Sequence, residues 1–175
     1  MAILQDQPTN PNFLSPLNFR FSIRRTPNIT YFLTGLSSPS LEVPFVNTSN
    51  PFITIPQPGD HITYSDLIIK FKVDEDLKNY LEIHDWIRAL GKPNFSEYKA
   101  LIDNEKTNPI NDTGRFSELS LMILNSAHGS NYEMVFETAF PYNISGLEFD
   151  SSKETVDYIE ATAAFKYIKY ELKQI

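Results

Sequence analysis

The chain has 175 residues, 41% of them apolar, which is an ordinary composition for one globular domain. It contains no cysteine, and this excludes disulfides, thiolate nucleophiles and cysteine-ligated metal centres. Acidic residues outnumber basic ones by 22 to 15, for a net charge of −7, which argues against a dedicated nucleic-acid binder because such proteins neutralise phosphates with Lys and Arg.

The start of the chain predicts a flexible N-terminal arm over residues 1–12, because it is rich in proline and polar residues. A single domain is expected over residues 13–175. The first residues lack the basic start and apolar run of a signal peptide, and no stretch approaches the ~18 apolar residues of a membrane helix. We therefore expect synthesis in a cytoplasm and no membrane insertion of the subunit.

Two strands are expected next. Asn18–Arg24 alternates Phe19, Phe21 and Ile23 with polar residues, the pattern of a half-buried strand. Thr30–Thr34, with sequence TYFLT, is a second strand candidate because it is rich in β-branched and aromatic residues.

The segment Leu36–Tyr64 is expected to be a long excursion from the domain. It holds five prolines, which deny it a place as a central strand, and only short extended pieces are expected at Glu42–Val46 and Phe52–Ile55. It is far longer than the usual connection of about 4–6 residues. We interpret it as an assembly element, with folding back onto the domain's own core as the alternative. The candidate interface residues are Val43, Phe45, Phe52, Ile53 and Ile55.

A strand running directly into a helix is predicted for residues 65–93. Leu67–Val73 alternates apolar and polar residues, and Asp74 stands at the N-cap position of a helix that ends at Leu90, before Gly91. The apolar spacing of three and four predicts that this helix packs on a sheet. The residues of the predicted packing face are Leu77, Tyr80, Leu81 and Ile87.

The second half of the chain begins with a short helix candidate, Phe95–Ile102, and a polar loop, Asp103–Gly114. The alternating residues of Leu119–Ile123 and Tyr132–Phe136 then predict an antiparallel hairpin. A bend is expected at Phe140–Gly146.

The last element, Thr155–Leu172, is interpreted as one very long strand or as two strands joined by a bulge. A helix is the rival interpretation because of its alanines, but β-branched and aromatic residues favour a strand. At ~3.3 Å per residue it would span about 60 Å, against ~17–20 Å for an ordinary strand. Such a strand must bend or reach beyond its own core.

Residues that could carry chemistry are scattered. His61, His84 and His128 have no carboxylate at metal-ligand spacing, and helix capping accounts for the acidic run Asp74–Asp76. The sequence has neither a phosphate-binding glycine loop nor a G-x-S-x-G nucleophile motif. The arginines around Phe19 and Phe21 could form a nucleic-acid platform, but the solvent face of a strand is the preferred interpretation. We expect no catalytic residues, no cofactor and no metal, and hence no enzyme.

The layout resembles the tail-tube family of contractile-tailed bacteriophages, which includes the tube protein and the baseplate protein that initiates the tube. The resemblance rests on NFLSPLNFRFSIRRTPNITYFLTGLSSPSLEVP, on NPFITIPQPGDHITYSDLIIKFKVDEDLKNYLEIHDWIRALGKP, and on the closing stretches ILNSAHGSNYEMVFETAFPYNISGLEFD and YIEATAAFKYIKYEL. It covers most of Asn12–Leu172 and leaves out the N-terminal arm and Asp103–Gly114.

The resemblance implies a mainly β, α+β fold: an antiparallel β-sandwich or barrel-like subunit with a packing helix. It implies six copies in a ring whose inner sheets join into a continuous barrel, and stacked rings that conduct DNA without sequence-specific binding. The implied partners are further copies of the chain, the tail sheath, and baseplate or tail-terminator proteins. The implied location is the virion tail, assembled in the host bacterial cytoplasm.

Several alternatives stay open at this point. The chain could be the repeating tube subunit, the baseplate initiator or a terminal-ring protein. It could instead be the tube protein of a non-viral contractile injection or secretion system. A monomeric β-sandwich module that grips a ligand with Phe45–Ile55 is the alternative from a different functional class.

Overall fold

The computed structural model describes residues 12–91, 94–102, 115–152 and 157–175. Outside this range lie the predicted N-terminal arm up to residue 11, the predicted loop Asp103–Gly114, and Thr155 and Val156 of the predicted last element. Within it, no helix is long and apolar enough to cross a membrane.

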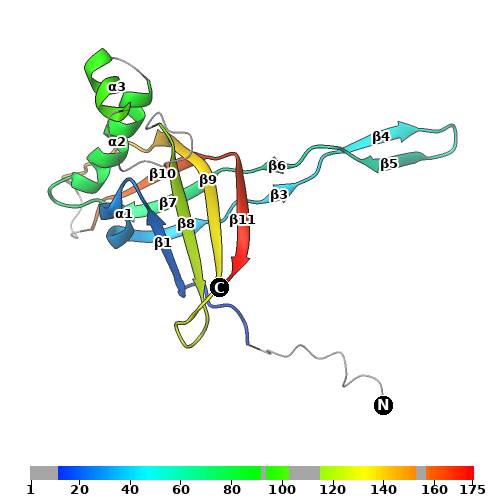
Figure 1. Ribbon diagram of the computed structural model, residues 1–175, viewed down its shortest axis with the longest axis horizontal. Coiled ribbons are helices and arrows are strands. Elements are labelled where there is room, and N and C mark those ends of the chain that lie inside the picture. Colours follow the sequence, from blue (N-terminus) through cyan, green and yellow to red (C-terminus); the bar gives the residue numbers. More distant parts are fainter. Residues whose placement is uncertain (1–11, 92–93, 103–114, 153–156) are drawn as a thin grey trace.

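Two antiparallel sheets form the body of the molecule and share one strand (Figure 1). Sheet A consists, in spatial order, of β1 (Phe19–Ile23), β8 (Ser117–Leu124), the first part of β9 (Ser130–Ile144) and β11 (Lys169–Gln174). Sheet B continues from the last part of β9 through β10 (Glu160–Lys166) and β7 (Leu67–Lys72) to β2 (Leu33–Ser37). The predicted fold class, a mainly β, sandwich-like subunit with a packing helix, is confirmed.

Strand β9 passes from sheet A to sheet B at a local distortion. Thr138 in the middle of the strand has a φ of 57°, a left-handed backbone that breaks the regular pleat. Residues before it pair with β8 and β11, whereas residues from Phe140 onward pair with β10. The predicted bend at Phe140–Gly146 is therefore misplaced, because the strand stays extended to Ile144.

The C-terminal segment also connects the two sheets. It forms two strands, β10 and β11, which are separated by Tyr167 and Ile168. This agrees with the interpretation of two joined strands, and the alternative interpretation as a helix is wrong. Both strands pair with β9, so the turn between them follows the bend of β9. The long strand that the sequence led us to expect at the C-terminus is instead β9.

The hydrophobic core lies between the sheets and follows the predicted alternation. Leu67, Ile69 and Phe71 of β7 are fully buried. Phe21 and Ile23 of β1 are only 1–2% exposed. Other core side chains come from every remaining strand of the two sheets except β2 and β11; among them are Leu119, Leu121, Met134, Phe136, Ala161, Ala163 and Phe165. The hairpin of β8 and β9 is antiparallel, as predicted.

Helix α2 (Lys78–Leu90) packs on the sandwich, but not through the whole predicted face. Leu77 and Leu81 are 38% and 45% exposed, so their assignment to the packing face is wrong. The buried residues of α2 are Asn79, Ile83, Trp86 and Ala89. Tyr80 and Ile87 are half-buried and pack against the core.

Two plausible apolar stripes explain the error, because Leu77 and Leu81 fit a spacing of three and four as well as Ile83 and Trp86 do. The larger Trp86 decides which stripe faces the sheets. Its indole N–H donates to the carbonyl of Arg115 at 3.0 Å, and its ring meets that of Phe165 edge-on at 6.2 Å between centroids.

The N-cap of helix α2 lies three residues later than predicted. Asp74 does not cap it; the N-cap residue is Leu77, in a left-handed backbone with a φ of 58°. The side chain of Asn79 organises the approach instead. Its amide donates to the carbonyl of Lys72 at 2.8 Å, and its oxygen accepts from the N–H of Asp74 at 3.2 Å.

Two further helices lie beside α2 in Figure 1. The shorter helix predicted at Phe95–Ile102 is confirmed as α3. The strand predicted at Thr30–Thr34 is wrong, because Pro27–Phe32 forms α1 and β2 begins only at Leu33. Proline at the first helical position favours this helix, and the fully buried Ile29 holds it on the core.

Candidate assembly surfaces

A two-stranded hairpin projects from the sandwich between β2 and β7, and we name residues 41–64 the arm (Figure 1). Its root pairs β3 (Leu41–Glu42) with β6 (Thr63–Tyr64), and its outer part pairs β4 (Phe45–Ser49) with β5 (Thr54–Pro58). Each pair forms a small sheet separate from sheets A and B. An isolated two-stranded hairpin is marginally stable in water, so the arm would gain stability from a partner surface.

The predicted interface residues are all exposed on the arm. Their exposed fractions are 46% for Val43, 67% for Phe45, 92% for Phe52, 63% for Ile53 and 40% for Ile55. The alternative that this segment folds back on its own core is therefore wrong. Their role as an assembly interface stays a prediction.

Apolar side chains occur on both faces of the arm. Alternation along the paired strands places Phe45, Pro56 and Pro58 on one face, and Val46 and Ile55 on the other. The two prolines lack N–H donors, so the outer edge of β5 is a poor template for another strand. The arm is thus suited to contact a partner through side chains on both faces rather than through its backbone edge.

The two parts of the arm meet at Pro44 and Gly59. The N–H of Gly59 donates to the carbonyl of Pro44 at 2.7 Å. A Cβ atom on Gly59 would lie 2.6 Å from that carbonyl oxygen, which is closer than side chains tolerate. Glycine is therefore required here for the two strands to approach.

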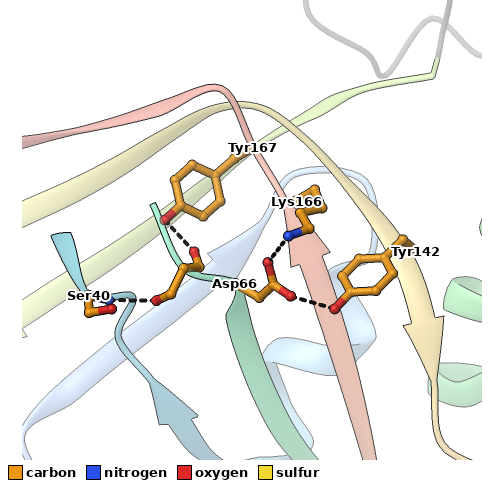
Figure 2. Close-up of polar contacts among 6 residues, drawn as sticks. Ser40, Asp66, Tyr142, Lys166 and Tyr167 are labelled. Carbon is orange, nitrogen blue, oxygen red and sulfur yellow. Dashed lines mark hydrogen bonds and ion pairs between the residues drawn. The ribbon is translucent and has the colours of Figure 1, made fainter. Parts of the chain in front are cut away.

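The root of the arm is fastened to sheet B by polar contacts (Figure 2). The carboxylate of Asp66 forms an ion pair with Lys166 of β10 and accepts a hydrogen bond from the Tyr142 hydroxyl of β9 at 2.5 Å. The bond from Lys166, and after it that from Tyr142, lowers the pKa of the Asp66 carboxyl, which keeps it ionised at neutral pH. On the other strand of the root, the N–H of Ser40 donates to the Ser65 hydroxyl at 2.7 Å.

Aromatic rings support the same junction. The ring of Tyr64 lies 5.9 Å from that of Tyr167 and 5.5 Å from that of Tyr170, between centroids, and Phe136 lies 5.1 Å from Tyr167. The Tyr167 hydroxyl donates to the carbonyl of Ser65 at 2.8 Å. Burial raises the pKa of Tyr167 to about 12, so this donor keeps its proton at physiological pH. These contacts fix the direction in which the arm leaves the sandwich.

The two edge strands of sheet A form a second candidate surface, because each has backbone groups on its outer side that could pair with another strand. Strand β1 pairs with β8 alone and β11 with β9 alone among the residues that the structure describes. Because the four strands alternate in direction, β1 and β11 run opposite to each other. An unpaired strand edge is a template for a strand from another chain.

Charged side chains follow both edges on the solvent face of sheet A. Glu171 of β11 forms ion pairs with Lys169 at 2.9 Å and Lys173 at 3.2 Å, and these two lysines lower the pKa of its carboxyl. Directly after β1, the Arg24 guanidinium lies 4.0 Å from the Glu118 carboxylate. Arg20 has an exposed side chain with no ion-pair partner in the described part of the chain.

The histidines and acidic residues singled out in the sequence are not brought together. His61 contacts Asp60 on the arm, His84 contacts Asp85 on α2, and His128 lies in the turn between β8 and β9. Among the described residues, no group of three or more His, Asp or Glu is arranged to hold a metal ion. An open hollow of about 500 Å³ has Arg20 and His128 among its lining residues, and no carboxylate.

Sequence reasoning found the arm but missed the edges of sheet A and the Asp66 contacts. The arm has a local signal, which is its proline density and exposed apolar residues. An edge strand is defined by which strands pair across the sheet, and no local pattern in NFRFSIR indicates that it has one neighbour rather than two. Asp66 lies about a hundred residues from Lys166, so their ion pair depends entirely on the fold.

A projecting arm and a sheet with two open edges define a subunit built for assembly with other chains. The comparisons with known proteins agree with this class. No family model matches the chain. A tail tube terminator protein of Enterobacteria phage T4 is 26% identical over 173 residues, which cover 93% of this chain and 90% of that protein.

Solved structures of similar fold come from other contractile machines. The tube terminating cap of the anti-feeding prophage has a TM-score of 0.62 at 11% identity and covers 100% of both chains. A chain of the sheath–tube complex of the extracellular contractile injection system PVC has a TM-score of 0.59 at 11% identity and covers 94% of both. At such low identity these structures establish the fold.

Together, the phage relative and the shared fold confirm the resemblance to tail-tube proteins. The chain is a structural component of the tube of a contractile tail, a class that includes the tubes of phages and of non-phage injection systems. Its location is accordingly tail-associated.

Proposed function

We propose that the chain forms a ring of six copies that terminates the tube of a contractile tail. The observation that carries the ring is the geometry of sheet A. In the described part of the chain it has four antiparallel strands, and its edge strands β1 and β11 each pair on one side only. With an even number of alternating strands, β11 of one copy meets β1 of the next in antiparallel orientation at every seam. Repetition of one such contact can close the sheets into a single barrel with no free edges.

The position at the end of the tube is supported by the phage T4 relative, which is described as a tail tube terminator and matches nearly the whole chain. Two of the structures with the same fold are also described as terminators or terminating caps. The partners we propose are the tube on which the ring sits, the tail sheath and the baseplate proteins of the same tail. In this role the ring conducts DNA without catalysing a reaction, and it assembles in the host cytoplasm.

The arm is proposed to dock between neighbouring copies or onto the adjacent ring. Its exposed Phe45 and Phe52 are costly in water, since burying one such side chain is worth roughly 1.5–3 kcal/mol. Val43, Ile53 and Ile55 add further exposed apolar side chains to the arm. Rigid fastening at Asp66 and Tyr167 reduces the entropy that the arm loses when it docks.

A repeating tube subunit, of a phage or of a non-viral injection system, is the second candidate. It is favoured by the fold shared with a chain of the PVC sheath–tube complex. The two candidates differ in what they assemble, because a terminator makes one ring and stops, whereas a repeating subunit stacks ring on ring.

Native mass spectrometry of the purified chain, alone and with isolated tail tubes, tests the proposal. We expect a closed species with the mass of six chains, and no series of larger multiples. A strictly monomeric chain under both conditions would rule out a ring former, and a ladder of stacked rings would favour the repeating subunit.

A further inference from the structure

The pairing registers of sheet A define straight rows of residues across the four strands. Phe21 lies opposite Leu121, Leu121 opposite Met134, and Met134 opposite Leu172, so this core-facing row runs from β1 to β11. The neighbouring row on the solvent face starts at Arg20 and ends at Lys173. If copies join edge to edge, as the proposed function requires, only the register between β11 and the next β1 is left to determine.

The two faces of the sheet restrict this register to even shifts. Phe19, Phe21 and Ile23 of β1 alternate with the exposed Arg20, Ser22 and Arg24. Along β11, Tyr170 and Leu172 alternate with the charged Lys169, Glu171 and Lys173. A shift of one residue would place arginines opposite core-facing side chains of β11. The rows of neighbouring copies must therefore be continuous or displaced by two residues.

Continuous rows are disfavoured by charge and by geometry. They would set Arg20 directly opposite Lys173, and Arg24 directly opposite Lys169, at every seam. Like charges in directly opposed positions destabilise a strand pair. Continuous rows would also add no stagger, whereas closure of a sheet into a barrel requires one.

A displacement of two residues removes both problems, and its direction is decided by the apolar residues. In one direction, Phe21 would lie opposite the polar Gln174, and the one apolar pair between the two strands would be Ile23 with Leu172. In the other direction, Phe19 lies opposite Leu172 and Phe21 opposite Tyr170. This second register makes two apolar pairs instead of one, and it covers Leu172, which is 57% exposed in the isolated chain.

We infer that β11 of one copy pairs with β1 of the next so that Arg20 lies opposite Glu171 and Ser22 opposite Lys169. This contact supplies Arg20 with an ion-pair partner, which it lacks among the described residues. Glu171 then accepts from Arg20 across the seam while it contacts Lys169 and Lys173 within its own chain. The occupant of each open edge is a second copy of this chain.

Cysteine cross-linking measures the register directly, because the chain has no native cysteine. Ser22→Cys is combined in turn with Lys169→Cys, Glu171→Cys or Lys173→Cys, all on the solvent face of sheet A. Directly opposite residues have Cα atoms about 4.5–5.5 Å apart, within disulfide range, while residues two positions away are ~7–8 Å apart, beyond it. Within one chain, β1 and β11 are separated by two strands, at least ~14 Å, so a disulfide can form only between copies.

The assembled variants are oxidised mildly and run on a non-reducing denaturing gel. We expect a ladder of covalent oligomers for the Ser22→Cys and Lys169→Cys pair, and at least tenfold less cross-linking for the other two. Rings that cross-link through Glu171→Cys or Lys173→Cys, or through none of the pairs, would overturn the register and leave the proposed function standing. A parent chain that forms no ring would overturn both.

Discussion

The buried face of α2 can be tested with two similar truncations on the same helix, Ile83→Ala and Leu81→Ala. Ile83 is 0% exposed and belongs to the core, so its truncation should cost about 2–5 kcal/mol through lost burial and the cavity left behind. Leu81 is 45% exposed. Full burial of a leucine is worth ~1.5–3 kcal/mol, so about half of that, roughly 1 kcal/mol, is lost, and the higher helix propensity of alanine returns a few tenths.

Urea unfolding followed by tryptophan fluorescence gives both free energies. Trp86 is the single tryptophan, it is buried beside Ile83 on the same helix face, and its emission should change on unfolding. We expect the midpoint of Ile83→Ala to fall clearly below that of Leu81→Ala, with the slope unchanged in both. Equal losses, or a larger loss for Leu81→Ala, would refute the assignment of the packing face.

Four further perturbations test other parts of the structure. Asn79→Ala should lower the free energy of unfolding by about 1–3 kcal/mol, measured in urea, because two partly buried backbone groups lose their partner. Replacing Phe45 and Phe52 together by Ser should abolish ring formation in native mass spectrometry while circular dichroism stays unchanged, and the equally exposed Phe149→Ser serves as control. Gly59→Ala should weaken assembly without lowering the thermal unfolding temperature of the sandwich by more than a degree or two, since the clash is confined to the arm. Asp66→Asn should destabilise the chain at neutral pH. Because the folded-state pKa of Asp66 is lowered, this difference from the parent should shrink as the pH falls through the ordinary value of 3.8 and below.

The strands of the sandwich could be predicted where alternation was strict. Leu67–Val73 and Asn18–Arg24 contain apolar residues at every second position, and burial of one strand face requires this pattern. The same reasoning failed at Thr30–Thr34, where aromatic residues suggested a strand. There, Pro27 starts a helix and burial of Ile29 keeps it in place, so packing overrides intrinsic preference.

Features that depend on contacts between distant residues could not be predicted. The choice between the two apolar stripes of α2 depends on Trp86 reaching Phe165, and the bend of β9 depends on the unusual backbone of Thr138. The arm was predicted because its signal is local. The edges of sheet A were not, because a strand becomes an edge only through the absence of a neighbour.

Electron microscopy of the chain mixed with isolated tail tubes tests the central claim most directly. The proposal predicts one closed ring of this chain at a single end of each tube, with no growth beyond it when the chain is in excess. Bare tube ends with monomeric chain in solution, or tubes that lengthen as chain is added, would contradict a ring that terminates the tube.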